Sequence, residues 1–403
     1  MKKKLLILTS TYPRWLGDPE PAFVHELAKR LTTQFNVHVL CPHARDAATQ
    51  ETLEGVEVVR YPYAPSRFET LVNDGGIVNN LKHQPWKWLL VPSFLLSLFW
   101  HARREIHCWR PNVIHAHWLL PQGLIVALLG LLDRHTPPFL VTSHGADLFA
   151  LRARPLTALK RFVARRATAL TVVSQAMTDE LERIGVPLNK VSVQPMGVDL
   201  THRFTPTPNQ PRSRDEILFV GRLVEKKGLR YLLDAMPKII ARHPSAFLTV
   251  VGFGPEENER RIQAETLGIA HKVHFLGPLA QTELPTLYRR VAVFVAPFVR
   301  ASSGDQEGLP VTLMEAIACG CPAVIGDLEA MLDLFEAEEA DLRVVSTDIQ
   351  ALAKQIIMVL KHPDDAHRRA DRMRARLSRR LSWDVIARQY MEILQSISSQ
   401  KKS

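Results

Sequence analysis

Residues 304–322 read G-D-Q-E-G-L-P-V-T-L-M-E-A-I-A-C-G-C-P, a stretch in which Glu307 and Glu315 stand with seven residues between them. The apolar run before it, Val291–Phe298, predicts a buried strand. Pro310 suits the first turn of a helix, and the glycine and proline at the end of the stretch terminate that helix. Glu307 is therefore expected in a loop beside a helix N-terminus, and Glu315 about two turns along the helix.

The two glutamates suit a ligand that carries both phosphate and hydroxyl groups. A helix N-terminus presents free backbone N–H groups and partial positive charge, which favour phosphate. A carboxylate further along has two oxygens that can each accept a hydrogen bond from a sugar hydroxyl. An alternative stays open, in which Glu307 only caps its own helix and Glu315 is solvated.

The whole stretch resembles the E-x7-E signature of retaining, nucleotide-sugar-dependent glycosyltransferases of family 4, and the preceding strand and the A-I-A-C-G-C-P continuation agree with it. The resemblance implies an α/β protein of the GT-B fold, in which two doubly wound, parallel-sheet, Rossmann-like domains face a central cleft. It also implies that Glu307 is catalytic and holds the donor sugar, while Glu315 holds the ribose. Gly308 and Leu309 would meet the donor diphosphate.

The totals of the chain suit a two-domain protein. A chain of 403 residues is long for one core, and its 46% hydrophobic and 23% charged residues are ordinary for a globular protein. Four cysteines are too few for a disulfide framework and favour a reducing compartment. Cys319 and Cys321 are expected to be small buried residues, because no further Cys or His cluster that would suit a metal lies near them in the sequence.

Apolar and polar runs alternate with strand and helix lengths throughout, which predicts parallel sheets covered by helices. We expect an acceptor-binding domain at 1–200 and a donor-binding domain at 215–381. The Pro-rich segment 201–214 between them lacks periodicity and is expected to be a linker. The tail 382–403 is amphipathic over most of its length, and the resemblance implies that this last helix crosses back onto the first domain.

The net charge of +10 lies mostly in the first half, which carries +7 over residues 1–200. No nucleic-acid motif accompanies it, so we expect no nucleic-acid partner and favour an anionic membrane surface. Trp86–Trp100, flanked by Lys82, Arg103 and Arg104, is too short and too interrupted to span a bilayer. The basic helix in Leu151–Arg166 is either solvated or suited to a lipid-linked acceptor. We expect a cytoplasmic protein, peripheral on the inner face of the membrane.

The run G-R-L-V-E-K-K-G at 221–228 follows a predicted strand and opens a helix at its last glycine. Arg222 and Lys227 are expected to hold a diphosphate whose charge grows as it departs, with Lys226 as a possible substitute. A solvated basic turn is the alternative. The N-terminal loop T-S-T-Y-P-R-W-L-G-D resembles the family's phosphate-contacting loop, where a Gly-Gly pair is common. Only Gly17 is present here.

Two glycine turns are expected near the nucleotide base. Gly252 and Gly254 end the strand in V-V-G-F-G-P, where a purely structural turn is an equal alternative. Leu276 and Leu279 belong to F-L-G-P-L, which resembles the segment whose backbone meets the base.

The run V-T-S-H-G-A-D at 141–147 resembles the family's H-G-x-[DE] active-site loop, so His144 is expected to be catalytic and Asp147 to line the acceptor cleft. His115 and His117 alternate in V-I-H-A-H-W, and we expect them to point to opposite faces of their strand. His117 is placed in the acceptor cleft with Arg14; a buried structural histidine is the alternative.

These expectations combine into a retaining glycosyltransferase. It would move a sugar from a nucleotide-sugar donor, UDP favoured over GDP, to a saccharide or lipid-linked acceptor in cell-envelope or extracellular polysaccharide synthesis. No metal and no cofactor are expected, because fixed cations neutralise the phosphates. A nucleotide-sugar 2-epimerase, a phosphorylase with pyridoxal phosphate and a non-catalytic nucleotide-sugar-binding regulator remain as alternatives.

Overall fold

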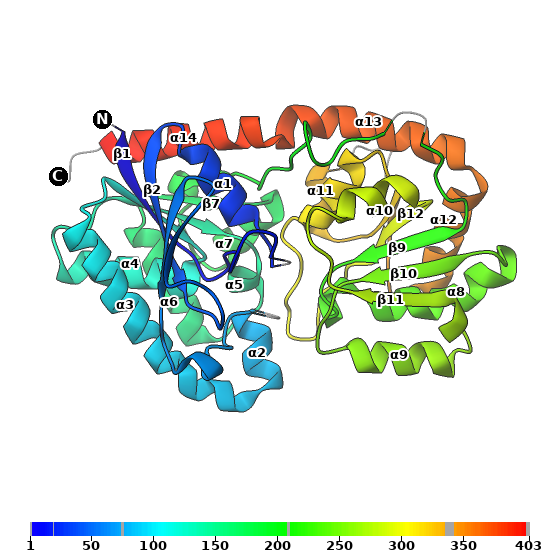
Figure 1. Cartoon of the computed structure of the whole chain (residues 1–403), viewed down its shortest axis with the longest axis horizontal. Helices are drawn as coiled ribbons and strands as arrows, with labels where there is room; N and C mark the ends of the chain where they lie inside the picture. Colours follow the sequence, from blue (N-terminus) through cyan, green and yellow to red (C-terminus); the bar gives the residue numbers. More distant parts are fainter. Residues whose placement is uncertain (1, 19, 74–75, 208–209, 335–341, 400–403) are drawn as a thin grey trace. The chain divides into compact units, whose positions relative to one another are not determined.

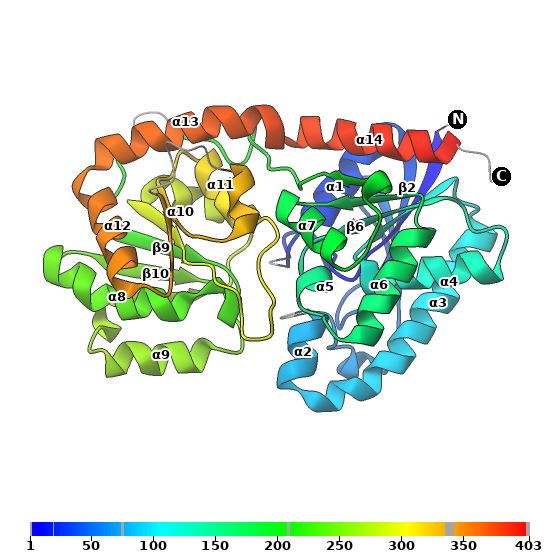
Figure 2. The same ribbon diagram turned by 180° about the vertical axis from the view of Figure 1, so that it is seen from behind.

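The computed structural model describes residues 2–18, 20–73, 76–207, 210–334 and 342–399. The chain divides into two compact units, Met1–Gly197 with Asp384–Ser403, and Val198–Trp383. Each unit is an α/β layer structure built on one sheet, as Figures 1 and 2 show from opposite sides.

The first unit contains an eight-stranded sheet in the order β3-β4-β2-β1-β5-β6-β7-β8. Its central strands are buried at nearly every position, which is the pattern of a parallel sheet covered on both faces. The strands are β1 (Lys3–Leu8), β2 (Phe35–Pro42), β3 (Gln50–Leu53), β4 (Val56–Tyr61), β5 (Val113–His117), β6 (Phe139–Ser143), β7 (Ala169–Val172) and β8 (Val191–Val193).

The first sheet is parallel, as expected, except at one edge. Strand β3 pairs with β4 in antiparallel fashion. The turn between them consists of Glu54 and Gly55, which both have positive φ, at 44° and 82°. A two-residue turn with this backbone geometry joins antiparallel strands and cannot lead into a parallel crossover.

Helices cover both faces of the first sheet. Figures 1 and 2 show α1 and α14 on one side and α3, α4 and α6 on the other. The helices of this unit are α1 (Phe23–Leu31), α2 (Ile77–His83), α3 (Leu90–Cys108), α4 (Leu124–Leu132), α5 (Ala146–Phe149), α6 (Arg154–Arg166), α7 (Gln175–Arg183) and α14 (Trp383–Ser399).

Helix α14 packs on the first unit through a buried tyrosine. The Tyr390 hydroxyl donates to the Gln194 carbonyl at 3.1 Å, and its ring lies 5.5 Å from the His115 ring. Near the end of the helix, Ser398 Oγ accepts from Lys3 Nζ at 2.8 Å. The last four residues of the tail that we expected to be helical, 400–403, lie outside the described residues.

The second unit contains a wholly parallel six-stranded sheet in the order β11-β10-β9-β12-β13-β14. Helices α8, α9 and α12 share one hydrophobic core with the sheet. The elements are β9 (Glu216–Val220), α8 (Leu229–Arg242), β10 (Phe247–Val251), α9 (Glu257–Thr266), β11 (Val273–Gly277), α10 (Leu284–Arg290), β12 (Val293–Ala296), α11 (Val311–Ala318), β13 (Ala323–Gly326), β14 (Arg343–Val344), α12 (Ile349–Lys361) and α13 (Pro363–Leu381).

The segment 201–214, expected to be a linker, makes several long-range hydrogen bonds with the second unit. Arg212 donates to the carbonyls of Tyr288 and Cys319 at 2.5 and 2.7 Å. Arg289 donates to the Thr205 carbonyl at 2.6 Å. These long-range contacts hold a segment whose composition alone gives no sign of order; its residues 208–209 lie outside the described part.

Candidate functional site

Two loops of the second unit lie together at the carboxyl edge of its sheet. Strands β9 and β12 are parallel neighbours, so the loops that follow them leave the same edge. The Val299 N–H donates to the Lys226 carbonyl at 3.0 Å, and the Ser302 N–H and hydroxyl donate to the Glu225 carboxylate at 2.8 Å each. The fold thus joins the G-R-L-V-E-K-K-G turn to the loop that carries Glu307.

Gly228 permits this close approach. It has a φ of +72°, and a Cβ there would lie 1.8 Å from the Pro297 carbonyl oxygen. No other residue fits without moving one of the two loops.

The Glu307 carboxylate lies between two lysines. Its Oε1 is 3.3 Å from Lys226 Nζ, and its Oε2 is 3.3 Å from Lys227 Nζ. Lys226 also contacts Asp305 at 3.1 Å. Burial disfavours the charged carboxylate, but the two ammonium groups outweigh it and lower the Glu307 pKa to about 2. Glu307 is therefore ionised across the physiological range.

Within the same cluster the pKa values of the two lysines shift in opposite directions. Burial lowers the pKa of Lys227 despite the Glu307 charge, whereas Glu307 and Asp305 together overcome burial and raise the pKa of Lys226. The charge of Arg222, an exposed residue of the same turn, acts on both lysines. Lys227 Nζ also lies 5.0 Å from the centre of the Phe298 ring. The cluster is a compact group of fixed cations around one carboxylate.

The helix after this loop has an uncapped N-terminus. Helix α11 begins after Pro310 without a side-chain cap, so the alternative in which Glu307 caps it does not hold. Within the described ranges, the N–H groups of Gly308 and Leu309 have no protein acceptor. Free N–H groups at a helix N-terminus are suited to a phosphate.

Glu315 is buried rather than solvated. It is 2% exposed and accepts from Gln281 Nε2 at 3.2 Å and from the Tyr288 hydroxyl at 3.3 Å. Burial raises its pKa to about 7, because these two hydrogen bonds only partly compensate for lost solvation. Glu315 therefore changes its protonation state near neutral pH.

The glycines expected near the base have structural reasons to be glycine. A Cβ on Gly252 would lie 2.0 Å from the Gly221 carbonyl oxygen, and one on Gly254 would lie 2.5 Å from that of Leu223. This turn therefore packs against the loop that is the candidate for diphosphate binding. Leu276 is 47% exposed on β11 and Leu279 is partly exposed in the loop that follows. Their role toward a base stays a prediction.

Three histidines gather at the carboxyl ends of β5 and β6 in the first unit. His117 Nδ1 is 2.9 Å from His144 Nε2, and their rings stack with centroids 5.1 Å apart. The expectation that His115 and His117 point to opposite faces is wrong, because residues two apart in a strand share a face. Their ring centroids are 4.1 Å apart.

Burial keeps all three imidazoles neutral. It lowers the pKa of His115 and His144 to about 3, and that of His117 well below its ordinary value. His115 is held by Thr142 Oγ1 at 2.7 Å, inside the sheet. Of the three, only His144 is partly exposed. His144 is thus the histidine with access to a substrate.

Asp147 holds the histidine loop together. Its carboxylate accepts from the Leu119 N–H at 2.6 Å and from the Ser143 hydroxyl at 2.8 Å, and the residue is 3% exposed. Both oxygens are engaged within the protein, which suits a positioning residue better than a direct acceptor contact.

Arg14 is paired within its own loop. Its guanidinium makes a bidentate contact with the Asp18 carboxylate at 2.9 and 2.7 Å, so its charge is already balanced. Gly17 has a φ of +84° with no atom within 4 Å of a would-be Cβ, so its open side is free for a ligand. The sequence offered no signal for the Arg14–Asp18 pair beyond its i,i+4 spacing.

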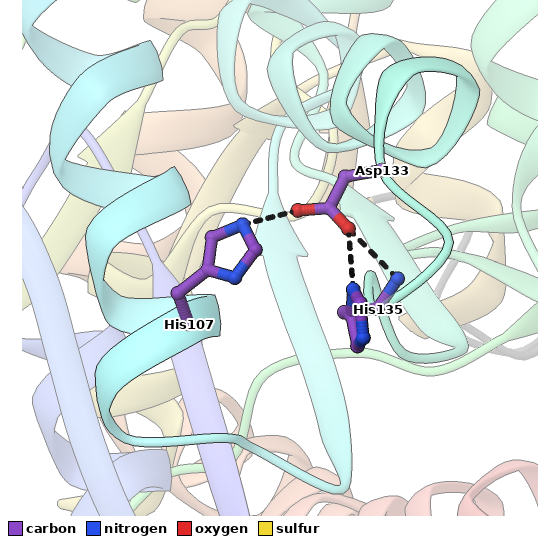
Figure 3. Close-up of side chains that lie close together, drawn as sticks. All are labelled: His107, Asp133 and His135. Atoms are coloured by element: carbon purple, nitrogen blue, oxygen red, sulfur yellow. Dashed lines mark hydrogen bonds and ion pairs between the residues drawn. The ribbon is translucent and has the colours of Figure 1, made fainter.

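Among the described residues, one group of side chains could hold a metal ion: His107, Asp133 and His135 (Figure 3). His107 Nε2 and His135 Nδ1 both approach the Asp133 carboxylate, at 2.5 and 3.0 Å. His107 precedes β5, and Asp133 and His135 precede β6, so the group lies at the amino ends of these strands. His117 and His144 lie at their carboxyl ends. The group is therefore separate from the histidine cluster.

The chain matches known families along most of its length. Residues 22–202 match the model described as Glycosyltransferase Family 4, and residues 204–376 match the model described as Glycosyl transferases group 1. A glycogen synthase of Mycobacterium tuberculosis is 26% identical over 95% of this chain and 92% of its own length. The putative colanic acid biosynthesis glycosyltransferase WcaL of Escherichia coli is 29% identical over 72% of this chain and 71% of its own.

Solved structures share the fold. Sucrose-phosphate synthase from Thermosynechococcus elongatus aligns with a TM-score of 0.79 at 20% identity, over 98% of this chain and 99% of that one. Anabaena HepE in complex with UDP and glucose aligns with a TM-score of 0.74 at 18% identity, over 98% and 100%. The two parallel-sheet units and these matches define a glycosyltransferase of the GT-B fold. The chain belongs to glycosyltransferase family 4.

Proposed function

We propose that this glycosyltransferase is a retaining enzyme that uses a UDP-sugar and transfers its sugar to a saccharide or lipid-linked saccharide during assembly of an envelope or extracellular polysaccharide. The observation that carries the proposal is the group formed by Lys226, Lys227 and Glu307 beside the uncapped start of α11. HepE has been solved with UDP-glucose, and WcaL and AmsK are named for colanic acid and amylovoran biosynthesis.

The cation group suits the departing diphosphate. When the sugar–phosphate bond breaks, negative charge grows on the leaving group, and cations already fixed in place stabilise that charge more than they stabilise the ground state. We assign this role to Arg222 and Lys227, supported by the N–H groups of Gly308 and Leu309. Fixed cations here make a metal ion unnecessary for neutralising the phosphates.

The two glutamates have different tasks because their environments differ. Glu307 is held ionised by two lysines, so it can accept hydrogen bonds from sugar hydroxyls but cannot donate a proton. Glu315, with a pKa raised to about 7 by burial, is assigned to the ribose hydroxyls. In the first unit, His144 is neutral and partly exposed, which suits a hydrogen bond to a hydroxyl group.

A donor and acceptor screen tests the proposal. The purified full chain is incubated with UDP- and GDP-sugars, with and without saccharide acceptors, and products are followed by NMR. We expect nucleotide release that depends on acceptor, and a new glycosidic bond with the donor's anomeric configuration. An altered donor sugar without acceptor would instead identify an epimerase. A complete lack of turnover with every donor would favour a binding protein.

We also propose that the first unit attaches to an anionic membrane surface. No helix of the described residues is long and apolar enough to cross a bilayer. Helix α3 buries Phe94, Leu98 and Ala102 against the unit, while its opposite side exposes Leu96 and Trp100 by 60% and 59%. Trp88 and Leu89, in the turn just before the helix, are also exposed, by 59% and 81%. Exposed Trp and Leu side chains flanked by Lys82, Arg103 and Arg104 suit the interface of a bilayer.

Liposome flotation tests this attachment. We expect the full chain to float with vesicles containing anionic lipid, and a variant with Trp88→Ser and Trp100→Ser to remain in the soluble fraction. Equal flotation of the two proteins, or no preference for anionic over neutral lipid, would contradict it.

A further inference from the structure

A basic cavity lies behind the histidine loop of the first unit. It has a volume of about 400 Å³ and lies between α5, α6 and α7. Four cationic side chains and one carboxylate line it: Arg152, Lys160, Arg161, Arg183 and Glu180. The basic helix of the sequence therefore does not simply face solvent or a membrane, because part of its charge is directed into a cavity.

The single carboxylate does not balance these cations. Glu180 is bound by Arg183 through two contacts of 2.6 Å, and Arg152 approaches it at 3.8 Å. Burial opposes the charge of Glu180, but Arg183 overcomes it and lowers the Glu180 pKa. An ionised Glu180 offsets one positive charge, so positive charge is left in excess around the cavity.

Lys160 is the buried one of the four cationic side chains that line the cavity. The residue is 1% exposed, and its ammonium donates to the Leu148 carbonyl at 2.8 Å. An ammonium group has three N–H donors, and throughout the described segments this carbonyl is its one protein acceptor within hydrogen-bond distance. Burial lowers the Lys160 pKa to about 8, against the attraction of Asp147 and Glu180. An anion in the cavity would stabilise this buried ammonium group, because it would pair with its charge and accept its unused N–H donors.

Arg161 provides an unpaired guanidinium at the same cavity. It is exposed and forms no ion pair with any described carboxylate. Its side chain runs beside Gly185, where a Cβ would lie 3.7 Å from Arg161 Cδ. Guanidinium groups bind phosphate oxygens through paired hydrogen bonds, so Arg161 suits such a ligand particularly well.

We propose that this cavity binds a phosphate-bearing anion through Lys160, Arg161 and Arg152. Its volume exceeds what a phosphate alone requires and falls in the range of small-molecule sites. The phosphate belongs either to a soluble phosphate ester or to a lipid headgroup. The binding site lies directly behind the candidate active-site loop, since Leu148 and Asp147 belong to the short helix α5 that starts just after His144.

Titration calorimetry with sodium pyrophosphate, at ionic strength matched with sodium chloride, tests the site. To keep the donor site out of the measurement, the full chain carries Lys227→Met in every sample. We expect Arg161→Gln to weaken pyrophosphate binding about tenfold or more, as for the loss of a charge-assisted contact. Arg154→Gln, on the same helix but outside the cavity, serves as the matched control and should bind like its parent.

Measurements of UDP binding and of pyrophosphate binding distinguish this anion site from the proposed donor site. In the otherwise native chain, UDP affinity should be unchanged by Arg161→Gln, so a loss of UDP binding in that variant would count against a separate anion site. Binding of pyrophosphate that is equal in the Arg161→Gln and Arg154→Gln variants would overturn the proposal. Displacement of pyrophosphate by glycerol phosphate would indicate a soluble ligand, and displacement only by vesicles containing phosphatidic acid would indicate a lipid one.

Discussion

Lys227 Nζ lies 3.3 Å from Glu307 Oε2, although 79 residues lie between these two side chains in the sequence. The contact joins the turn after β9 to the loop after β12, two motifs that the sequence analysis assigns to the same donor. Lys226 holds the other oxygen of the same carboxylate at 3.3 Å. A substrate phosphate entering this group would meet cations that are already arranged.

Replacement of Glu307 should destabilise the protein without ligand, because the two lysines lose the negative charge that lies between them. In Glu307→Gln the two partly exposed ammonium groups lose their shared anion, while Lys226 keeps Asp305 at 3.1 Å, so we expect a cost below the about 3–5 kcal/mol of breaking a fully buried ion pair. We expect a lower melting temperature without ligand and a smaller deficit with saturating UDP, because the diphosphate supplies negative charge. Thermal unfolding with and without UDP measures this. A deficit that UDP leaves unchanged would indicate that the diphosphate does not reach these lysines.

Glu315 should make stability depend on pH. Its pKa rises from 4.5 in the unfolded chain to about 7 in the folded protein, so the folded state keeps a proton that the unfolded state has lost. Its contribution to stability is therefore present below pH 4.5 and is lost as the pH rises to about 7. Glu315→Gln cannot ionise, so its melting temperature relative to wild type should rise between pH 5 and 7.5.

Calorimetry checks the role assigned to the same residue. If ribose hydroxyls donate to an ionised Glu315, UDP binding at pH 6.5 should release protons in the wild type but not in Glu315→Gln. Glu265→Gln, an exposed glutamate on α9, is the control for both measurements. Equal proton release from all three proteins would remove Glu315 from the nucleotide site.

His144 should act without titrating. Burial lowers its pKa to about 3, so the pH profile of kcat/KM between pH 5.5 and 8 should contain no limb from this histidine. We expect His144→Ala to lower kcat about 100-fold, the usual loss when one hydrogen-bond donor to a reacting centre is removed, with partial rescue in His144→Gln. His271→Gln, at an exposed site of the second unit, is the control. A wild-type profile with a limb near pH 6.5 that disappears in His144→Gln would contradict a neutral His144.

Transfer should be insensitive to metal removal. Lys226 and Lys227 supply positive charge beside Glu307, and the charge of Arg222 acts on both lysines. The candidate metal ligands His107, Asp133 and His135 precede β5 and β6, whereas His144 follows β6. Initial rates should therefore be the same with and without EDTA. Activity that EDTA abolishes and Mg²⁺ restores would show that these cations do not suffice for the leaving group.

The parts that the sequence predicted well are those with strong local patterns. The short runs V-I-H-A-H and F-L-V-T-S at 113–117 and 139–143 predict strands, and the structure has β5 (Val113–His117) and β6 (Phe139–Ser143) at these positions. The edge strand β3 reads Q-E-T-L, and such a short and mostly polar run does not predict a strand. The described residues of 201–214 are held by contacts between Arg212 and the Tyr288 and Cys319 carbonyls and between Arg289 and the Thr205 carbonyl, partners that are more than 70 residues apart in the sequence.

In the candidate site, too, local sequence patterns were predictable and contacts with distant residues were not. The sequence analysis assigns the turn at 221–228 and the stretch at 304–322 to one donor site, and the structure brings Lys227 and Glu307 into contact. Charge balance was not predictable from residue type. Arg14 is neutralised by Asp18, Asp147 is occupied by its own loop, and Lys160 is buried instead of lying on a solvated face. Each of these depends on a tertiary neighbour.

The dissociation constant of UDP, measured by calorimetry at fixed ionic strength for wild type, Arg222→Gln and Lys227→Met, tests most directly whether these two cations hold the donor diphosphate. Lys238→Met, an exposed lysine on α8, is the matched control. Removal of one charge-assisted contact costs about 1.5–3 kcal/mol, so each site variant should bind UDP about 10- to 100-fold more weakly while the control binds normally. Dissociation constants equal to that of wild type in both site variants would contradict the account.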